Sequence, residues 1–154
     1  MKLTFATVGK PRASWAKDAL DHYARFLSKY SDVEWLWARA VAGADSREAI
    51  DTETERLLQL VKGKPGFKIA CDKHGVALSS VDLAKRLQEE TDRHSGRAII
   101  VIGGPWGFDE RVRMWADLVW SFGPMTLAHE LALVVAVEQT ARALSILRGD
   151  SYHK

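Results

Sequence analysis

The chain has 154 residues, of which 47% are hydrophobic and 27% charged, and its formal net charge is +2. We expect one globular domain over residues 1–154, because this length and balance are typical of a single folded domain. The small net charge is not the basic excess that is typical of nucleic-acid binding, although a local basic patch or a second copy of the chain could supply RNA contacts. The single cysteine excludes a disulfide framework and a thiolate zinc cluster.

No apolar run approaches the roughly 20 residues that cross a bilayer. The opening MKLTFATVGK is too short and too alternating for a signal peptide. We therefore expect a cytoplasmic protein with neither a metal nor a membrane segment.

Segments with strand and helix patterns alternate along the chain. Strands are expected at about 2–9, 32–39, 67–72 and 97–102, and helices at about 14–30, 46–62, 80–94, 109–116 and 129–148. Ser14 is expected to cap the first helix and Gly149 to end the last. Regular alternation predicts an α/β fold with a mostly parallel sheet and helices on both faces.

Three segments at strand ends are candidates for binding a ligand, which in such sheets lies beyond the carboxyl ends of the strands. They are Cys71-Asp72, Gly103-Gly104-Pro105 and Gly123–Leu127. Glycine lets a ligand approach the backbone closely. The stretch IGGPWG has neither the spacing of a dinucleotide fingerprint nor the Lys-Ser/Thr of a P-loop, and a set of plain tight turns remains an alternative. Trp106 on this loop is a candidate pocket residue.

The segment from Leu131 to Val137 is apolar on every side of a helix, so we expect it to be buried in the core or in an oligomer interface. Glu138 and Arg142 are four residues apart and lie on one stripe of this helix. They are either an ion pair at the margin of an interface or a cation held by a carboxylate beside a substrate. The sequence leaves both interpretations open.

The chain ends GDSYHK, which gathers an aromatic ring, a titratable ring and a cation at Tyr152, His153 and Lys154. A solvated tail is the alternative interpretation. The histidines show no metal-binding spacing, and no nucleophile elbow is present. Cys71 is better explained as a small buried residue than as a nucleophile.

Taken together, IGGPWGF, WSFGPMTLAHELALVVAVEQTARALSIL and the terminal GDSYHK resemble the small SPOUT methyltransferases of the RlmH type. These bacterial enzymes methylate N3 of a pseudouridine in 23S ribosomal RNA. The resemblance covers the full length of the chain. It implies that the C-terminal part of the α/β sheet forms a deep trefoil knot, which the general rarity of knots would not suggest.

The resemblance also implies S-adenosylmethionine (SAM) as cofactor, bound in the knot. The implied cofactor residues are Cys71, Asp72, Gly103, Gly104, Pro105, Gly123, Pro124, Met125, Thr126, Leu127 and Ala128. Family members are homodimers that bury the last helix, and the tail of one chain closes over the SAM of the other. The partner would be the assembled ribosome with its 23S RNA.

Six residues match the polar site positions of the family: His129, Glu138, Arg142, Tyr152, His153 and Lys154. The sequence departs from the family pattern at four positions. Ala128 and Ser151 replace prolines, Leu133 replaces an arginine and Ala141 replaces a tyrosine. These changes affect the tail and the RNA contact surface, and they leave the cofactor glycines intact.

The implied reaction needs a proton acceptor, since N3 of pseudouridine is protonated at neutral pH. His153 is our first candidate for this role, with Tyr152 stacking on or orienting the base. Arg142, held by Glu138, and Lys154 would bind phosphate or the developing anion. Two alternatives are a SPOUT methyltransferase with another RNA target and a non-catalytic knotted module that binds a nucleotide or a protein.

Overall fold

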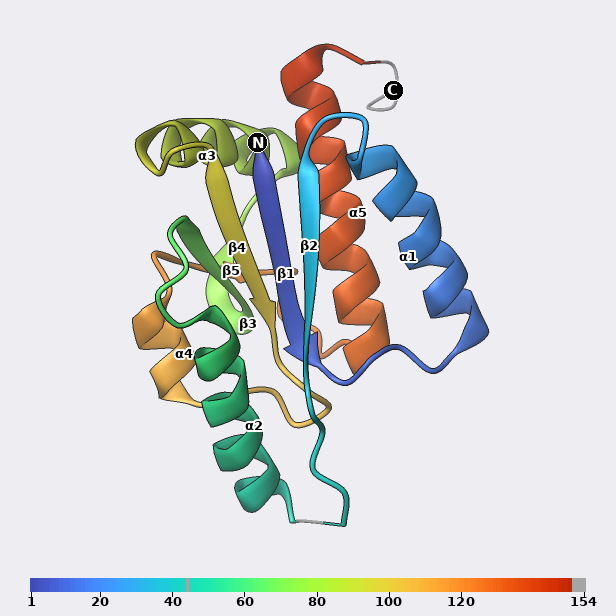
Figure 1. Cartoon of the computed structure of the whole chain (residues 1–154), viewed down its shortest axis with the longest axis vertical. Helices are drawn as coiled ribbons and strands as arrows, with labels where there is room; N and C mark the ends of the chain where they lie inside the picture. Colours follow the sequence, from blue (N-terminus) through green and yellow to red (C-terminus); the bar gives the residue numbers. More distant parts are fainter. Residues whose placement is uncertain (44, 151–154) are drawn as a thin grey trace.

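The computed structural model describes residues 1–43 and 45–150, and a sheet of five parallel strands lies at its centre (Figure 1). The strand order is β2-β1-β4-β3-β5. The strands are β1 (Lys2–Val8), β2 (Asp32–Ala38), β3 (Phe67–Ala77), β4 (Arg97–Ile102) and β5 (Leu118–Ser121). The helices are α1 (Ser14–Leu27), α2 (Ser46–Val61), α3 (Ser80–Arg93), α4 (Glu110–Trp115) and α5 (His129–Arg148).

The sheet has a hydrophobic core on each face, because successive side chains of a strand point to opposite faces. Phe5 of β1 and Ile100 of β4 pack in the core formed with α1, α3 and α5. Val8, Ile99 and Val101 pack in the second core, with α2 and α4. The predicted parallel sheet with helices on both faces is therefore confirmed.

The predicted bounds of β4 and α5 agree with the structure, and Gly149 ends α5 in the left-handed conformation (φ 71°). The start of α1 differs from the prediction. Ala13, not Ser14, is the N-cap residue, and it makes no side-chain cap. Instead, the Glu130 carboxylate of α5 accepts hydrogen bonds from the backbone N–H groups of Arg12 (2.6 Å) and Ala13 (3.2 Å).

Strand β3 continues beyond its expected end at residue 72. A register shift places both Cys71 and Val76 opposite Trp120 of β5, so that residues 72–75 form a bulge. Gly75 makes the close return possible, because a Cβ there would lie 2.3 Å from the carbonyl oxygen of Val119. The bulge places Asp72, Lys73 and His74 beyond the carboxyl end of the first half of the strand.

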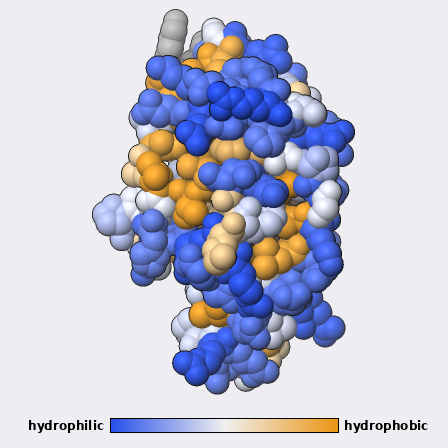
Figure 2. Space-filling model, turned by 90° about the vertical axis from the view of Figure 1, so that its left-hand side faces the viewer, coloured by the Kyte–Doolittle hydropathy of each residue, from blue (hydrophilic) through white to orange (hydrophobic). Residues whose placement is uncertain are grey.

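Figure 2 shows the side of the molecule on which β5 forms the edge of the sheet. Hydrophilic residues cover its upper part, over α3, and hydrophobic residues are exposed across its middle, between α3 and α2. None of the helices in the described part of the chain combines the length and the apolar character that crossing a bilayer needs.

Candidate active site

A cavity of about 290 Å³ lies among the loops that follow the first half of β3, β4 and β5. The three candidate segments of the sequence meet there. The predicted site residues that line it are Cys71, Asp72, Gly103, Gly104, Pro105, Gly123, Met125, Thr126, Leu127 and His129. Pro124 and Ala128 lie in the same loop but are exposed and do not border the cavity.

The loop after β4 is a tight turn that contributes mostly backbone to the cavity. The N–H of Gly107 donates a hydrogen bond to the carbonyl of Gly104 at 2.8 Å, with Pro105 at the second position of the turn, where its fixed φ is favourable. A Cβ on Gly103 would lie 2.7 Å from the carbonyl carbon of Gly107. A Cβ on Gly104 would lie 2.5 Å from Oε2 of Glu53. Side chains are therefore excluded at both glycines.

Helix α2 supports this loop from behind. Glu53 is 2% exposed, and its Oε1 accepts a hydrogen bond from the N–H of Val41 at 3.0 Å. The buried hydroxyl of Thr54 accepts one from the N–H of Asp109 at 3.1 Å. Sequence reasoning missed both residues, because they occur in a polar helical segment and nothing local indicates that they face the loop after β4.

The bulge of β3 carries a charged cluster into the cavity wall. The Asp72 carboxylate accepts hydrogen bonds from the backbone N–H and the ring Nδ1 of His74, each at 2.8 Å, and lies 3.2 Å from Arg113 Nη1. Burial raises the pKa of Asp72, but the bonds from His74 and the charge of Arg113 outweigh it and lower the pKa below the ordinary value. Asp72 is therefore an ionised acceptor in this wall.

The loop after β5 is tied to the bulge through one hydroxyl. Ser121 Oγ accepts a hydrogen bond from the N–H of Gly123 at 3.1 Å and lies 3.3 Å from the carbonyl oxygen of Lys73. Ser121 itself is 4% exposed. The two loops therefore form one continuous wall, which neither would make alone.

His129 begins α5 and joins it to the end of β1. Its Nε2 lies 2.9 Å from the carbonyl oxygen of Val8, so Nε2 carries the proton and donates it. Nδ1 is left as an acceptor, and it has no hydrogen-bond partner among the described residues. This bond holds His129 in the cavity wall, and its role in catalysis stays a prediction.

Cys71 borders the cavity as a neutral thiol. Burial, and secondarily the charge of Asp72, raise its pKa well above the ordinary value. A thiol is a weak nucleophile compared with its thiolate. The structure thus agrees with the interpretation of Cys71 as a packing residue.

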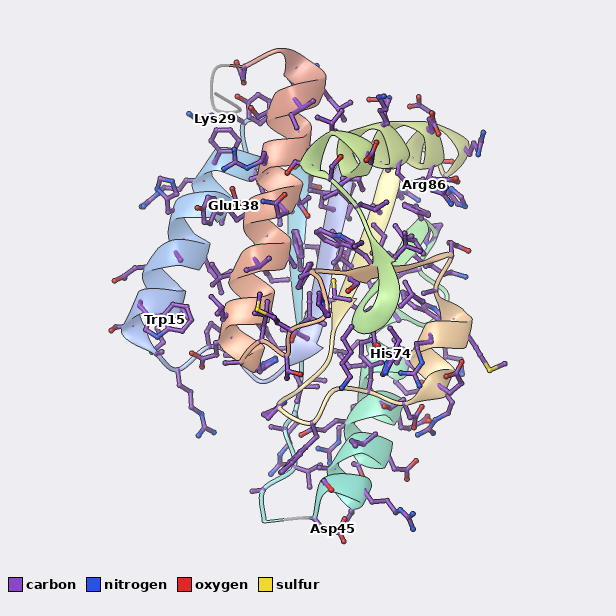
Figure 3. All side chains as sticks on the ribbon, turned by 180° about the vertical axis from the view of Figure 1, so that it is seen from behind. Trp15, Lys29, Asp45, His74, Arg86 and Glu138 are labelled. Carbon is purple, nitrogen blue, oxygen red and sulfur yellow. The ribbon has the colours of Figure 1, made fainter. Side chains whose placement is uncertain are left out.

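Glu138 and Arg142 form the predicted ion pair, with Arg142 Nη2 and Nε at 2.7 and 3.0 Å from Glu138 Oε1. Neither residue lines the cavity. Glu138 follows His129 by nine residues, about 13 Å along the helix. Figure 3 shows the two labelled residues Glu138 and His74 well apart. Tyr152, His153 and Lys154 lie outside the described residues.

Several residues that line the cavity were not predicted as site residues. They are Lys73, His74, Ile102, Gly107, Phe108, Arg113, Phe122 and Ala132. The prediction that Trp106 lines a pocket is confirmed. Within residues 1–43 and 45–150, no group of three His, Cys, Asp or Glu side chains is arranged to hold a metal ion.

Residues 1–153 match the model of a family described as "Predicted SPOUT methyltransferase". The chain therefore belongs to the SPOUT methyltransferase family.

Among its relatives are two proteins named ribosomal RNA large subunit methyltransferase H. The chain is 33% identical to the one from Geobacter sp. (strain M21) over 153 residues, which cover 99% of each chain. It is 38% identical to the one from Desulfovibrio desulfuricans over 150 residues, which cover 96% of this chain and 94% of the relative.

Two solved structures share the fold at low sequence identity. One is a probable methylase family protein from Haemophilus influenzae, with a TM-score of 0.59, 10% identity, and coverage of 99% of this chain and 70% of that one. The other is a probable methyltransferase from Bordetella pertussis, with a TM-score of 0.56, 16% identity, and coverage of 92% and 95%.

Proposed function

We propose that this protein transfers a methyl group from SAM to N3 of a pseudouridine in 23S ribosomal RNA, on the assembled ribosome. The observation that carries the proposal is the cavity. Three loops far apart in sequence converge on it, and each contains the glycines or backbone groups of the family's cofactor motif. The full-length likeness to large-subunit RNA methyltransferases supports the choice of substrate.

The residues of the cavity suit SAM. The backbone at Gly103, Gly104 and Gly123 borders the cavity and can contact a nucleoside closely, and Leu127 and Phe108 give apolar contacts. The ionised Asp72 can accept a hydrogen bond from a ribose hydroxyl or an amino group. When bound, SAM supplies a methyl group that is already activated by the positive sulfonium.

The protein's own part in the reaction is to align the acceptor nitrogen and to remove its proton. Alignment alone contributes several kcal/mol to such transfers. His153 accepts the N3 proton, and Tyr152 orients the base. Lys154 and Arg142, the latter held by Glu138, stabilise the anion that develops on the base or bind a nearby phosphate.

The catalytic unit is a homodimer whose interface contains α5. In support, Leu131 is 40% exposed and Val134 is partly exposed, whereas Leu133, Ala136 and Val137 of the same helix are buried. The expected burial of this helix on every side is thus incomplete in one chain, and a second copy would complete it. In this dimer the tail of each protomer would act at the cavity of the other.

We further infer that the chain is one domain with a trefoil knot, formed where α5 and the loop before it pass the loop after β4. The protein works in the cytoplasm, where ribosomes are assembled. The family membership supports both inferences.

The first experiment is methyl transfer from radiolabelled SAM to ribosomes from a strain that lacks its own enzyme of this type. The modified nucleotide is then mapped. We expect label on one pseudouridine of the large-subunit RNA. Tight SAM binding without label on any ribosomal particle would contradict the substrate and direct the search to other RNAs or to a non-catalytic role.

A second experiment tests the proton acceptor. His153→Ala should lower the rate of methyl transfer at least tenfold, while calorimetry shows SAM binding close to that of the wild type. Unchanged turnover would remove His153 from the mechanism.

A further inference from the structure

We propose that the indole of Trp106 is the platform on which the target base of the RNA stacks, at the mouth of the cavity. This inference rests on the proposed function and adds a substrate-binding residue to it.

The backbone holds Trp106 in a defined place. The residue is third in the Gly104–Gly107 turn, after Pro105, and the turn is closed by the hydrogen bond and the isolated β-bridge between its two glycines. Close packing of Gly103 on Gly107 fixes the turn to the end of β4. The indole therefore projects from a rigid support, which lowers the entropy lost when a ligand binds to it.

The indole is exposed although it borders the cavity. It is 60% exposed, whereas the neighbouring Phe108 on the same loop is 6% exposed. In the described part of the chain, its ring stacks on no other aromatic ring and no cation lies over it. A large apolar ring that is carried by a fixed turn, lines a pocket and lacks a stacking partner is well placed to receive a flat ligand.

The size of the cavity favours a base at its mouth. A volume of about 290 Å³ lies at the lower end of the range for ligand sites, so one bound SAM is enough to fill the cavity. The base that receives the methyl group must therefore approach from the rim. A base that leaves its own stack in folded RNA regains contact by stacking on an aromatic side chain.

The charges at the rim fit RNA. Lys73 and His74 line the same cavity, and both are exposed. Lys73 makes no ion pair among the described residues, whereas Arg113 is paired with Asp72 and Glu110. A lysine beside the platform can contact a phosphate that flanks the stacked base. These neighbours favour a nucleotide over an uncharged apolar partner.

The experiment compares Trp106→Ala and Trp106→Phe with the wild type and a control, Met114→Ala. Met114 is 78% exposed on α4 and does not line the cavity. Binding to assembled ribosomes is measured by co-sedimentation with S-adenosylhomocysteine present, and SAM binding by calorimetry without ribosomes. The rate of methyl transfer is measured on the same preparations.

We expect Trp106→Ala to weaken ribosome binding by about 5- to 150-fold, the range for loss of one aromatic–base stack, with unchanged SAM affinity. Trp106→Phe should stay within about threefold of the wild type, because a phenyl ring also stacks. Met114→Ala should bind as the wild type does. An equal loss of SAM affinity in Trp106→Ala would show that the indole covers the cofactor and would overturn the proposal, as would unchanged ribosome binding.

The two proposals fail in different ways. Ribosome binding by the wild type without methyl transfer contradicts the proposed function alone, since the comparison of Ala and Phe at position 106 still tests stacking. Absence of ribosome binding by the wild type rejects both.

Discussion

Among the glycines that line the cavity, Gly104 leaves the least space for a side chain. A methyl group there would meet the buried carboxylate of Glu53 at 2.5 Å and the Cβ of Val8 at 3.2 Å. We expect Gly104→Ala to lower the free energy of unfolding by about 1–3 kcal/mol, typical of an overpacked core. SAM affinity should fall at least tenfold, because the buried Glu53 carboxylate or the loop that borders the cavity must move.

Gly43→Ala is the control for Gly104→Ala, since it adds a methyl group in open space, at a glycine that unlike Gly104 has a positive φ (71°). It should cost about 1 kcal/mol of stability through backbone strain and leave SAM binding unchanged. Urea denaturation and calorimetry measure the two quantities. SAM binding by Gly104→Ala at wild-type affinity would refute the role of this contact.

Asp72 gives a prediction about pH. Its pKa is lower in the folded chain than its ordinary value, so its ionised form stabilises the fold above that value, and the contribution is lost as the pH falls through the folded pKa. Asp72→Asn should therefore be about 1–2 kcal/mol less stable than the wild type near pH 7. The difference should shrink below about pH 4.

Urea denaturation at several pH values measures this difference. Asp18→Asn, at an exposed position of α1, is the control and should change stability by less than about 0.5 kcal/mol. If the difference in the free energy of unfolding between Asp72→Asn and the wild type stayed constant down to the lowest pH, this would contradict the interactions described for Asp72.

The sequence predicted the loops that line the cavity, but it did not predict the residues of other elements that contact these loops. Glycine and proline signal a turn through their own backbone preferences, so the loops at Gly103 and Gly123 could be found locally. Glu53 and Arg113 could not, because their roles depend on residues about 40 to 50 positions away. The roles of Tyr152, His153 and Lys154 stay predictions.

At the scale of the elements, one carboxylate joins the first and last helices. Glu130 of α5 accepts from two backbone N–H groups at the start of α1, which has no cap of its own. Glu130→Ala should lower the free energy of unfolding by about 1–2 kcal/mol, as loss of a helix cap does. Glu89→Ala, at an exposed position of α3, is the control in urea denaturation. Equal stability of both variants would show that this cap is ineffective.

The elements themselves were largely predictable, because each has a clear period of apolar residues. Two differences have long-range causes. Ser14 has the residue type of a cap, but the cap comes from Glu130, more than 100 residues away. Strand β3 was expected to end at residue 72. Its continuation could not be predicted, because the bulge that returns to β5 depends on how Gly75 packs against Val119.

At the scale of the whole molecule, the proposed sharing of each site between two protomers predicts complementation. Gly104→Ala impairs the cavity and His153→Ala impairs the tail, so neither homodimer should be active. Co-expression should restore about a quarter of the wild-type activity, because half of the dimers are mixed and each mixed dimer has one intact site. No recovery would place cavity and tail in the same chain. Differently tagged chains allow the mixed dimer to be purified and assayed alone.

The contacts between β1 and α5 also determine when this molecule can become complete. His129 bonds to Val8 across 121 positions, Glu130 bonds to Arg12 across 118, and β1 lies between β2 and the much later β4. Contacts over such separations form slowly, because the entropy of closing the long loop is lost before the contact contributes any stability. Strand β1 can pair with β2 early, but its other edge and its end at Val8 stay without their partners until β4 and α5 have been made. A protein that we propose to act on assembled ribosomes thus completes its own fold late, when α5 has been made.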